Sequence, residues 1–185
     1  MSRWTLYQVA VLVVFAIVVG GVWWSLSQRT APAPKADKTE PQVSPEALHH
    51  FQVFLHRKPC ASDCRDYAVL AKGSGKIEYV GGKNVAMHGT QTAPLTVGQL
   101  EALYRSVKQA KFFSIPDIYH NGPGGTGCSA LIAGKPRVVI GVTRKGQTKV
   151  IHYDYGCRGA PAKLARLADS IDSVLKTQRW TGPGQ

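Results

Sequence analysis

The sequence predicts an α+β protein in which an N-terminal transmembrane helix precedes a mostly antiparallel sheet with two helices. Three observations predict this class. A long apolar run occupies the N-terminal region, several short segments beyond it have the two-residue periodicity of strands, and two later segments have the 3.6-residue periodicity of amphipathic helices. Runs of strands separated by single helices are typical of α+β domains.

The apolar run Trp4–Leu26 contains no charged residue across its 23 positions. As a helix it would extend about 34 Å at about 1.5 Å per residue, enough to cross a hydrocarbon core of about 30 Å. Trp4 and Trp24 lie near its two ends, where amphipathic rings favour the headgroup region. We therefore expect a membrane anchor at residues 1–27, with the transmembrane helix at about 4–26.

The processing and orientation of this segment leave alternatives. A cleaved signal peptide would be cut best after Ala31-Pro32-Ala33, but Pro34 after the cut disfavours it. Basic residues flank the run on both sides, so charge alone leans weakly toward a cytoplasmic C-terminus. The four cysteines favour the opposite orientation, because disulfides persist outside the cytoplasm. We expect a single-pass protein of the inner membrane, with a cytoplasmic N-terminus and a periplasmic or extracellular domain.

Residues 28–45 predict a linker, because they contain four prolines and almost no bulky apolar side chain. Such a chain buries no core and favours extended conformations. The globular pattern begins at about Glu46, so we expect the exported domain at 46–185.

Alternating apolar residues and turn sequences predict the strands of this domain, and periodic apolar residues predict its helices. Thr96 and Gln99 have the spacing of a capping box before the first helix, and Pro161 begins the second. A long loop at 116–127 follows the first helix. The predicted strands are His50–Lys58, a hairpin of Tyr67–Ala71 with Lys76–Val80, a short strand at Val85–Met87, and a second hairpin of Arg137–Thr143 with Thr148–Tyr153.

The four cysteines permit three pairings. We favour Cys60–Cys64 and Cys128–Cys157, because each pair joins loops at the ends of strands. On the chain-entropy model the first bond contributes about 2 kcal/mol and the second between about 3 and 4 kcal/mol.

A metal or redox role for the first pair is the alternative. His56, Cys60 and Cys64 recur at intervals of four, and a Cys-x-x-x-Cys motif on a membrane-tethered domain resembles the Sco copper chaperones. Thiolates and imidazole suit copper or zinc, and paired thiols suit thiol–disulfide exchange. Pro59 and the flanking strand patterns disfavour the helix that this spacing would need. We therefore expect no metal ligands or cofactor in the main interpretation, and copper on these three residues in the alternative.

No motif in the chain predicts a catalytic residue. The glycine-rich segment 122–127 does not enter a helix as a phosphate-binding loop does, and no serine lies in a triad context. Asp169 and Asp172 lie three apart on the second helix and are expected as neighbours on its surface. A catalytic role would require a pocket and a partner for this pair. The sequence thus favours a non-catalytic binding or interaction domain over an enzyme.

The charge of the chain is +12, and residues 46–185 carry 19 Lys and Arg against nine Asp and Glu. These basic residues are spread along every predicted element, and few aromatic residues lie among them. Nucleic-acid binding would require a basic face and access to nucleic acid, which an exported domain lacks. An anionic membrane surface or cell-wall polymer is the better electrostatic partner.

The order of several short motifs resembles a bacterial family known only as a domain of unknown function. The resemblance covers about Phe51 to Trp180 and implies an envelope location, but it brings no activity. Relatives usually carry a Thr-Asp pair where this chain has Ala133–Pro136. The matching motifs are Pro59-Cys60-x-x-x-Cys64-x-x-Tyr67, Tyr79-x-Gly81, Lys111-Phe112-Phe113, Tyr119, His152-Tyr153-x-x-Gly156-Cys157, Ala160-Pro161, Ile171-Asp172 and Arg179-Trp180.

Overall fold

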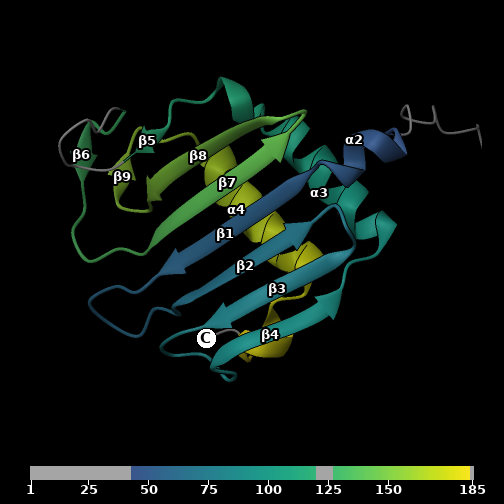
Figure 1. The fold of residues 1–185 in the computed structure, drawn as a ribbon. Coiled ribbons are helices and arrows are strands. Elements are labelled where there is room, and N and C mark those ends of the chain that lie inside the picture. Colours follow the sequence, from purple (N-terminus) through teal and green to yellow (C-terminus); the bar gives the residue numbers. More distant parts are fainter. Residues whose placement is uncertain (1–42, 120–126, 184–185) are drawn as a thin grey trace, which may run out of the picture. The chain divides into compact units, whose positions relative to one another are not determined.

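A seven-stranded sheet is the framework of the structure, a computed structural model that describes residues 43–119 and 127–183. Its strand order is β4-β3-β2-β1-β7-β8-β5, and all neighbouring strands are antiparallel except β5 and β8. Helices α3 and α4 lie together across one face of the sheet, and the other face is open (Figure 1). The predicted α+β class with a mostly antiparallel sheet is therefore confirmed for this part of the chain.

The elements follow one another in chain order. The strands are β1 Gln52–Lys58, β2 Tyr67–Lys72, β3 Lys76–Gly81, β4 Gly89–Pro94, β5 Ile118–Tyr119, β6 Ala130–Leu131, β7 Arg137–Arg144, β8 Gln147–Asp154 and β9 Cys157–Arg158. The helices are α2 Pro45–His49, α3 Val97–Gln109, α4 Ala162–Leu175 and α5 Gln178–Thr181, with a 3₁₀ turn at Phe112–Ser114.

Strand alternation places one set of side chains against the helices. In β1 the side chains of Val53 and Leu55 are buried, while Phe54 and His56 are only partly buried. By the same alternation the side chain of Arg57 lies on the buried side, because successive side chains of a strand point to opposite faces. A charged group thus enters the layer between sheet and helices at the end of β1.

Both predicted hairpins are present in the structure. Strands β2 and β3 pair Lys72 with Lys76, and β7 and β8 pair Arg144 with Gln147. Within the second turn, Lys145 and Gly146 have φ angles of 51° and 74°. Two left-handed residues match the twist of a two-residue hairpin, which accounts for the glycine.

The helix signals are also confirmed. The Thr96 hydroxyl accepts a hydrogen bond from the backbone N–H of Gln99 at 3.2 Å, and the Gln99 side chain accepts one from the backbone N–H of Thr96 at 3.1 Å. Pro161 is the N-cap of α4, whose buried face holds Leu164, Leu167 and Ile171 among others. Helices α3 and α4 pack against each other and complete the core.

The expected fourth strand at Val85–Met87 is wrong, because the strand that pairs with β3 is Gly89–Pro94. This edge strand has the sequence GTQTAP and contains no fully buried residue, so it lacks the apolar alternation that marks a half-buried strand. The sequence also did not indicate the two-residue strands β5, β6 and β9 or the short helices α2 and α5.

The predicted anchor at 1–27, with its helix at 4–26, lies outside the described residues. Across 43–119 and 127–183, no helix has the length and apolarity needed to cross a membrane. The anchor, and the extent of the linker at 28–45, therefore remain predictions.

Gly156 tests the packing of the turn that joins β8 to β9. A Cβ at this position would collide with the Ile132 carbonyl oxygen, so Gly156→Ala is expected to lower the free energy of unfolding by about 2 kcal/mol. Gly98 in α3 has open space around it, and Gly98→Ala is expected to raise stability by up to about 1 kcal/mol. Urea denaturation of both variants measures the difference. Equal effects would contradict the close approach at Gly156.

Candidate anion-binding site

The two disulfides join Cys60 to Cys64 and Cys128 to Cys157, as favoured from the sequence. Their Cα atoms are 5.4 Å and 5.1 Å apart, within the usual range for such bonds. The Cys60 and Cys64 sulfur atoms are bonded to each other, so they offer no thiolate to copper in this form. The ring of His56 instead contacts Asp66, with Nε2 and Oδ1 3.3 Å apart. The described residues contain no group of three or more His, Cys, Asp or Glu arranged to hold a metal ion.

A pocket of about 1100 Å³ opens at the end of the sheet where β1 ends and β2 and β7 begin. The C-terminal end of α4 and the segment after it form its other wall. Its lining includes six cationic side chains and two carboxylates. These are Arg57, Lys58, Arg65, Arg137, Lys176 and Arg179, with Asp169 and Asp172.

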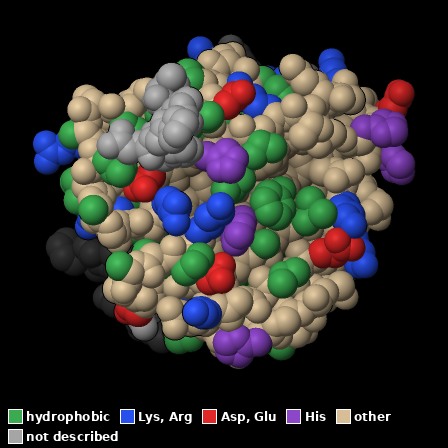
Figure 2. Space-filling view, turned by 60° about the vertical axis from the view of Figure 1, so that its left-hand side comes forward, with side chains coloured by type: hydrophobic (Ala, Val, Ile, Leu, Met, Phe, Trp, Pro, Cys, Tyr) green, Lys and Arg blue, Asp and Glu red, His purple; other side chains and the backbone are tan. Residues whose placement is uncertain are grey.

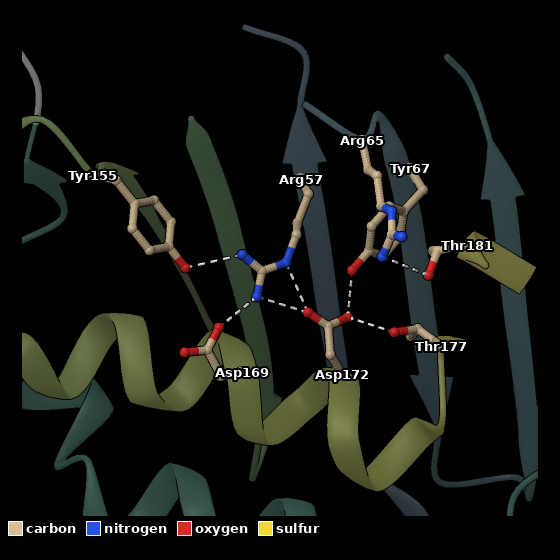
Figure 3. A network of polar contacts seen from close by, with 8 residues as sticks. All are labelled: Arg57, Arg65, Tyr67, Tyr155, Asp169, Asp172, Thr177 and Thr181. Carbon is tan, nitrogen blue, oxygen red and sulfur yellow. Dashed lines mark hydrogen bonds and ion pairs between the residues drawn. The ribbon is translucent and has the colours of Figure 1, made fainter. Parts of the chain in front are cut away.

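Arg57 and Asp172 are the centre of a polar network in this pocket (Figure 3). The Arg57 Nε–H donates to Asp172 Oδ2 at 2.7 Å, and Nη2 lies 2.7 Å from the same oxygen. The Tyr67 hydroxyl donates to Asp172 Oδ1 at 2.6 Å, and the Thr177 hydroxyl donates to it at 2.9 Å. Both oxygens of this carboxylate are thus satisfied by donors from two strands and from the turn after α4.

Asp169 makes a weaker contribution. Its Oδ1 accepts a hydrogen bond from Arg57 Nη2 at 2.8 Å, and its side chain is 67% exposed, against 18% for Asp172. Arg57 Nη1 donates to the Tyr155 hydroxyl at 3.0 Å, so every nitrogen of the guanidinium has a partner. The sequence predicted that both aspartates lie on the surface of the helix. This is correct for Asp169 and wrong for Asp172, whose side chain is turned toward the sheet.

The surroundings of Arg57, Tyr67 and Tyr155 favour the protonated form of each side chain. Burial disfavours the charge of the Arg57 guanidinium, but neighbouring Asp172 has the opposite effect and the pKa of Arg57 is raised overall. Burial, and then the Asp172 carboxylate, raise the pKa of the Tyr67 hydroxyl above its ordinary value. Burial also raises the pKa of Tyr155. Tyr67 therefore remains a neutral donor, and Arg57 remains a cation, across the physiological pH range.

The other five cations of the pocket differ from Arg57, because none makes an ion pair with a carboxylate of the described residues. Arg65 donates to the Thr181 hydroxyl at 3.5 Å and to the Pro183 carbonyl oxygen. Arg179 lies over the ring of the buried Trp180, with its guanidinium carbon 3.9 Å from the ring centroid. The side chains of the remaining three have no hydrogen-bond or ion-pair partner in the described residues; these are Lys58, Arg137 and Lys176.

The pocket can therefore hold an anion and offers little for acid–base chemistry. Asp172 accepts from four donor atoms and is paired with an arginine, whereas a general base needs an available lone pair. Five cations line the same space without a carboxylate partner. Charge-assisted contacts from Lys and Arg are the usual means of holding phosphate and carboxylate groups.

A family model described as "Domain of unknown function (DUF6438)" matches residues 51–175, two thirds of the chain. The chain belongs to the DUF6438 family. The match agrees with the resemblance to an uncharacterised domain family, and it assigns no reaction to the domain. Among curated proteins, none matches the chain.

In this DUF6438 domain the structure brings Asp169 and Asp172 together with Arg57, which sequence reasoning assigned only to a strand. A signal for Arg57 was present, because it follows Val53 and Leu55 on the buried side of β1. An arginine on the buried side of a strand requires a carboxylate partner, and Asp172 directly follows Ile171, a buried residue of α4. The grouping of Lys58, Arg137 and Lys176 had no such signal, since they come from three distant segments.

The Arg57–Asp172 ion pair predicts unequal effects for the two aspartates of the DUF6438 domain. Asp172→Asn is expected to cost about 3 kcal/mol of stability, because it leaves a mostly buried guanidinium without its main counter-charge. Asp169→Asn, three residues away and exposed, is expected to cost less than about 1 kcal/mol. Urea denaturation at neutral pH measures both, and similar costs would show that the pair does not fasten α4 to the sheet.

The raised pKa of Tyr67 predicts a loss of stability at high pH. The folded domain keeps this proton above pH 10, where the unfolded chain releases it, so the stabilisation is complete below about pH 10 and is lost as pH rises further. Tyr67→Phe is expected to make the decline in unfolding free energy above pH 10 shallower. Tyr104→Phe is the control, because the Tyr104 hydroxyl makes no hydrogen bond in the described residues. An unchanged decline in Tyr67→Phe would contradict the assignment.

Proposed function

We propose that this chain is a membrane-tethered protein of the bacterial cell envelope whose domain is a non-catalytic binding module for an anionic partner. The partner binds in the basic pocket at the end of the sheet. The apolar segment at 4–26 would hold the chain in the inner membrane, with the domain on the periplasmic or extracellular side.

One observation carries this proposal. Among the described residues, two carboxylates line the pocket, Asp169 and Asp172, and both are paired with Arg57, so the five other cations have no carboxylate partner there. Like charges gathered in one hollow repel one another, and the repulsion is relieved when an anion enters. The pocket is thus a site whose charge is complementary to a phosphate or carboxylate group.

Two features support an exported location. The domain contains two disulfides, and disulfides persist in oxidising compartments. The uncharged run at 4–26 has the length of a membrane span. In that compartment anionic lipids and cell-wall polymers are the abundant polyanions, which favours an envelope partner over nucleic acid. The alternative of a copper or thiol-redox protein centred on Cys60 and Cys64 gains no support from the bonded sulfur atoms.

Binding of inorganic tripolyphosphate to the full chain in a neutral detergent tests the proposal. Isothermal titration calorimetry is expected to show one site per chain, with an affinity that falls as salt is raised because the contacts are ionic. Arg137→Gln combined with Lys176→Asn is expected to weaken binding by about tenfold or more. Asparagine suits position 176 because the backbone there has a φ of 53°.

Arg166→Ala is the matched control. This residue is an exposed cation on α4 that does not line the pocket, so its loss reduces the net charge without changing the site. Tripolyphosphate affinity is expected to stay within about twofold of wild type. Absence of binding, or equal weakening by Arg166→Ala and the double variant, would refute an anion site in the pocket.

A further inference from the structure

A second basic hollow adjoins the first. It has a volume of about 800 Å³ and lies on the open side of the sheet, where the disulfide loop after β1 faces β7 and β8. Its charged lining consists of Lys58, Lys135, Arg137 and Asp154, with His152 beside them. Two of these residues, Lys58 and Arg137, line both pockets, so they form the boundary between the two hollows.

These two boundary residues are directly opposite each other. Lys58 is the last residue of β1 and pairs in register with Arg137, the first residue of β7. Cross-strand partners have Cβ atoms only about 5 Å apart, and like charges in that position are destabilising. Asp154 pairs with Arg137 from the other side, but it is buried, accepts a hydrogen bond from the Gly156 N–H, and makes no ion pair with Arg137. Neither Lys58 nor Arg137 thus makes an ion pair within the described residues.

Basic side chains also lie on the face that Figure 2 presents. Figure 2 shows Lys and Arg side chains beside two histidines and a hydrophobic patch, with acidic side chains around them. The six cations of the two pockets other than Arg57 are Lys58, Arg65, Lys135, Arg137, Lys176 and Arg179. A single small anion in one hollow would contact only some of them.

We infer that the ligand of this domain is a linear polyanion, with phosphate or carboxylate groups repeated along one chain, that crosses Lys58 and Arg137 and occupies both hollows. The inference rests on the proposed function and adds the class and path of the ligand. Each hollow receives one or more anionic groups, and the boundary pair receives the group between them. Linking two binding events in one chain raises affinity beyond that of either event alone.

The lining favours such a polymer over a single-stranded nucleic acid. Proteins that bind single strands present open aromatic faces on which bases stack. The tyrosines that line the two hollows, Tyr67 and Tyr153, are only 4% and 8% exposed. An anionic polysaccharide or polyphosphate chain needs only the charges.

Chain length is the variable that tests the inference. Binding of tripolyphosphate and of long-chain polyphosphate to the full chain in neutral detergent is compared by calorimetry. A longer chain offers more phosphate groups and therefore more ways to bind. Beyond this statistical factor, the affinity of long-chain polyphosphate for one protein is expected to be at least about tenfold higher than that of tripolyphosphate. Lys135→Ala, which changes only the second hollow, is expected to weaken long-chain binding about three- to tenfold and to leave tripolyphosphate binding unchanged. Arg166→Ala is expected to leave both unchanged.

The outcomes separate the two proposals. If tripolyphosphate binds but Lys135→Ala has no selective effect on the long chain, the inference is overturned and the anion site in the first pocket stands. If neither probe binds, both fail. Tighter binding of single-stranded DNA of matched charge, or of vesicles containing an anionic phospholipid, would also overturn the inference, because each would assign the surface to another class of partner.

Discussion

The ion pair between Arg57 and Asp172 is the interaction on which the rest of the domain depends. It joins the end of β1 to α4, two elements separated by 115 positions in the sequence. Tyr67 from β2 and Thr177 from the turn after α4 donate to the same carboxylate, so one side chain holds two strands, a helix and a turn together. A buried ion pair of this kind contributes little net free energy, but loss of one partner is costly. Its main consequence is to fix the position of α4 against the end of the sheet.

That arrangement also determines the electrostatics of the pocket. Arg57 takes both carboxylates that line the site, and the cations around it remain without acidic partners. The structural network and the proposed binding surface are therefore coupled. Because Asp169 and Asp172 pair with Arg57, they do not pair with the other cations. An excess of positive charge therefore remains at the end of the sheet where the two hollows lie.

Sequence reasoning succeeded where the signal is local. The second hairpin follows from strand alternation around Lys145-Gly146, and α3 follows from the capping residues Thr96 and Gln99. The disulfide pairing followed from the placement of cysteines in loops at strand ends. It failed at β4, because an exposed edge strand carries no apolar alternation. It also missed the pocket, because Lys58, Arg137 and Lys176 meet only through the β1–β7 register and the end of α4.

The central claim is that an anion binds among these cations, and side-chain NMR of arginine tests it most directly. In the full chain with ¹⁵N-labelled arginine, titration with tripolyphosphate is expected to shift the Nε–Hε resonances of Arg65, Arg137 and Arg179. The resonance of Arg57 should move little, because its Nε–H already donates to Asp172. Arg105, Arg144 and Arg166, which lie outside the pocket, should not move. Uniform small shifts across all arginines, or shifts only outside the pocket, would contradict the account.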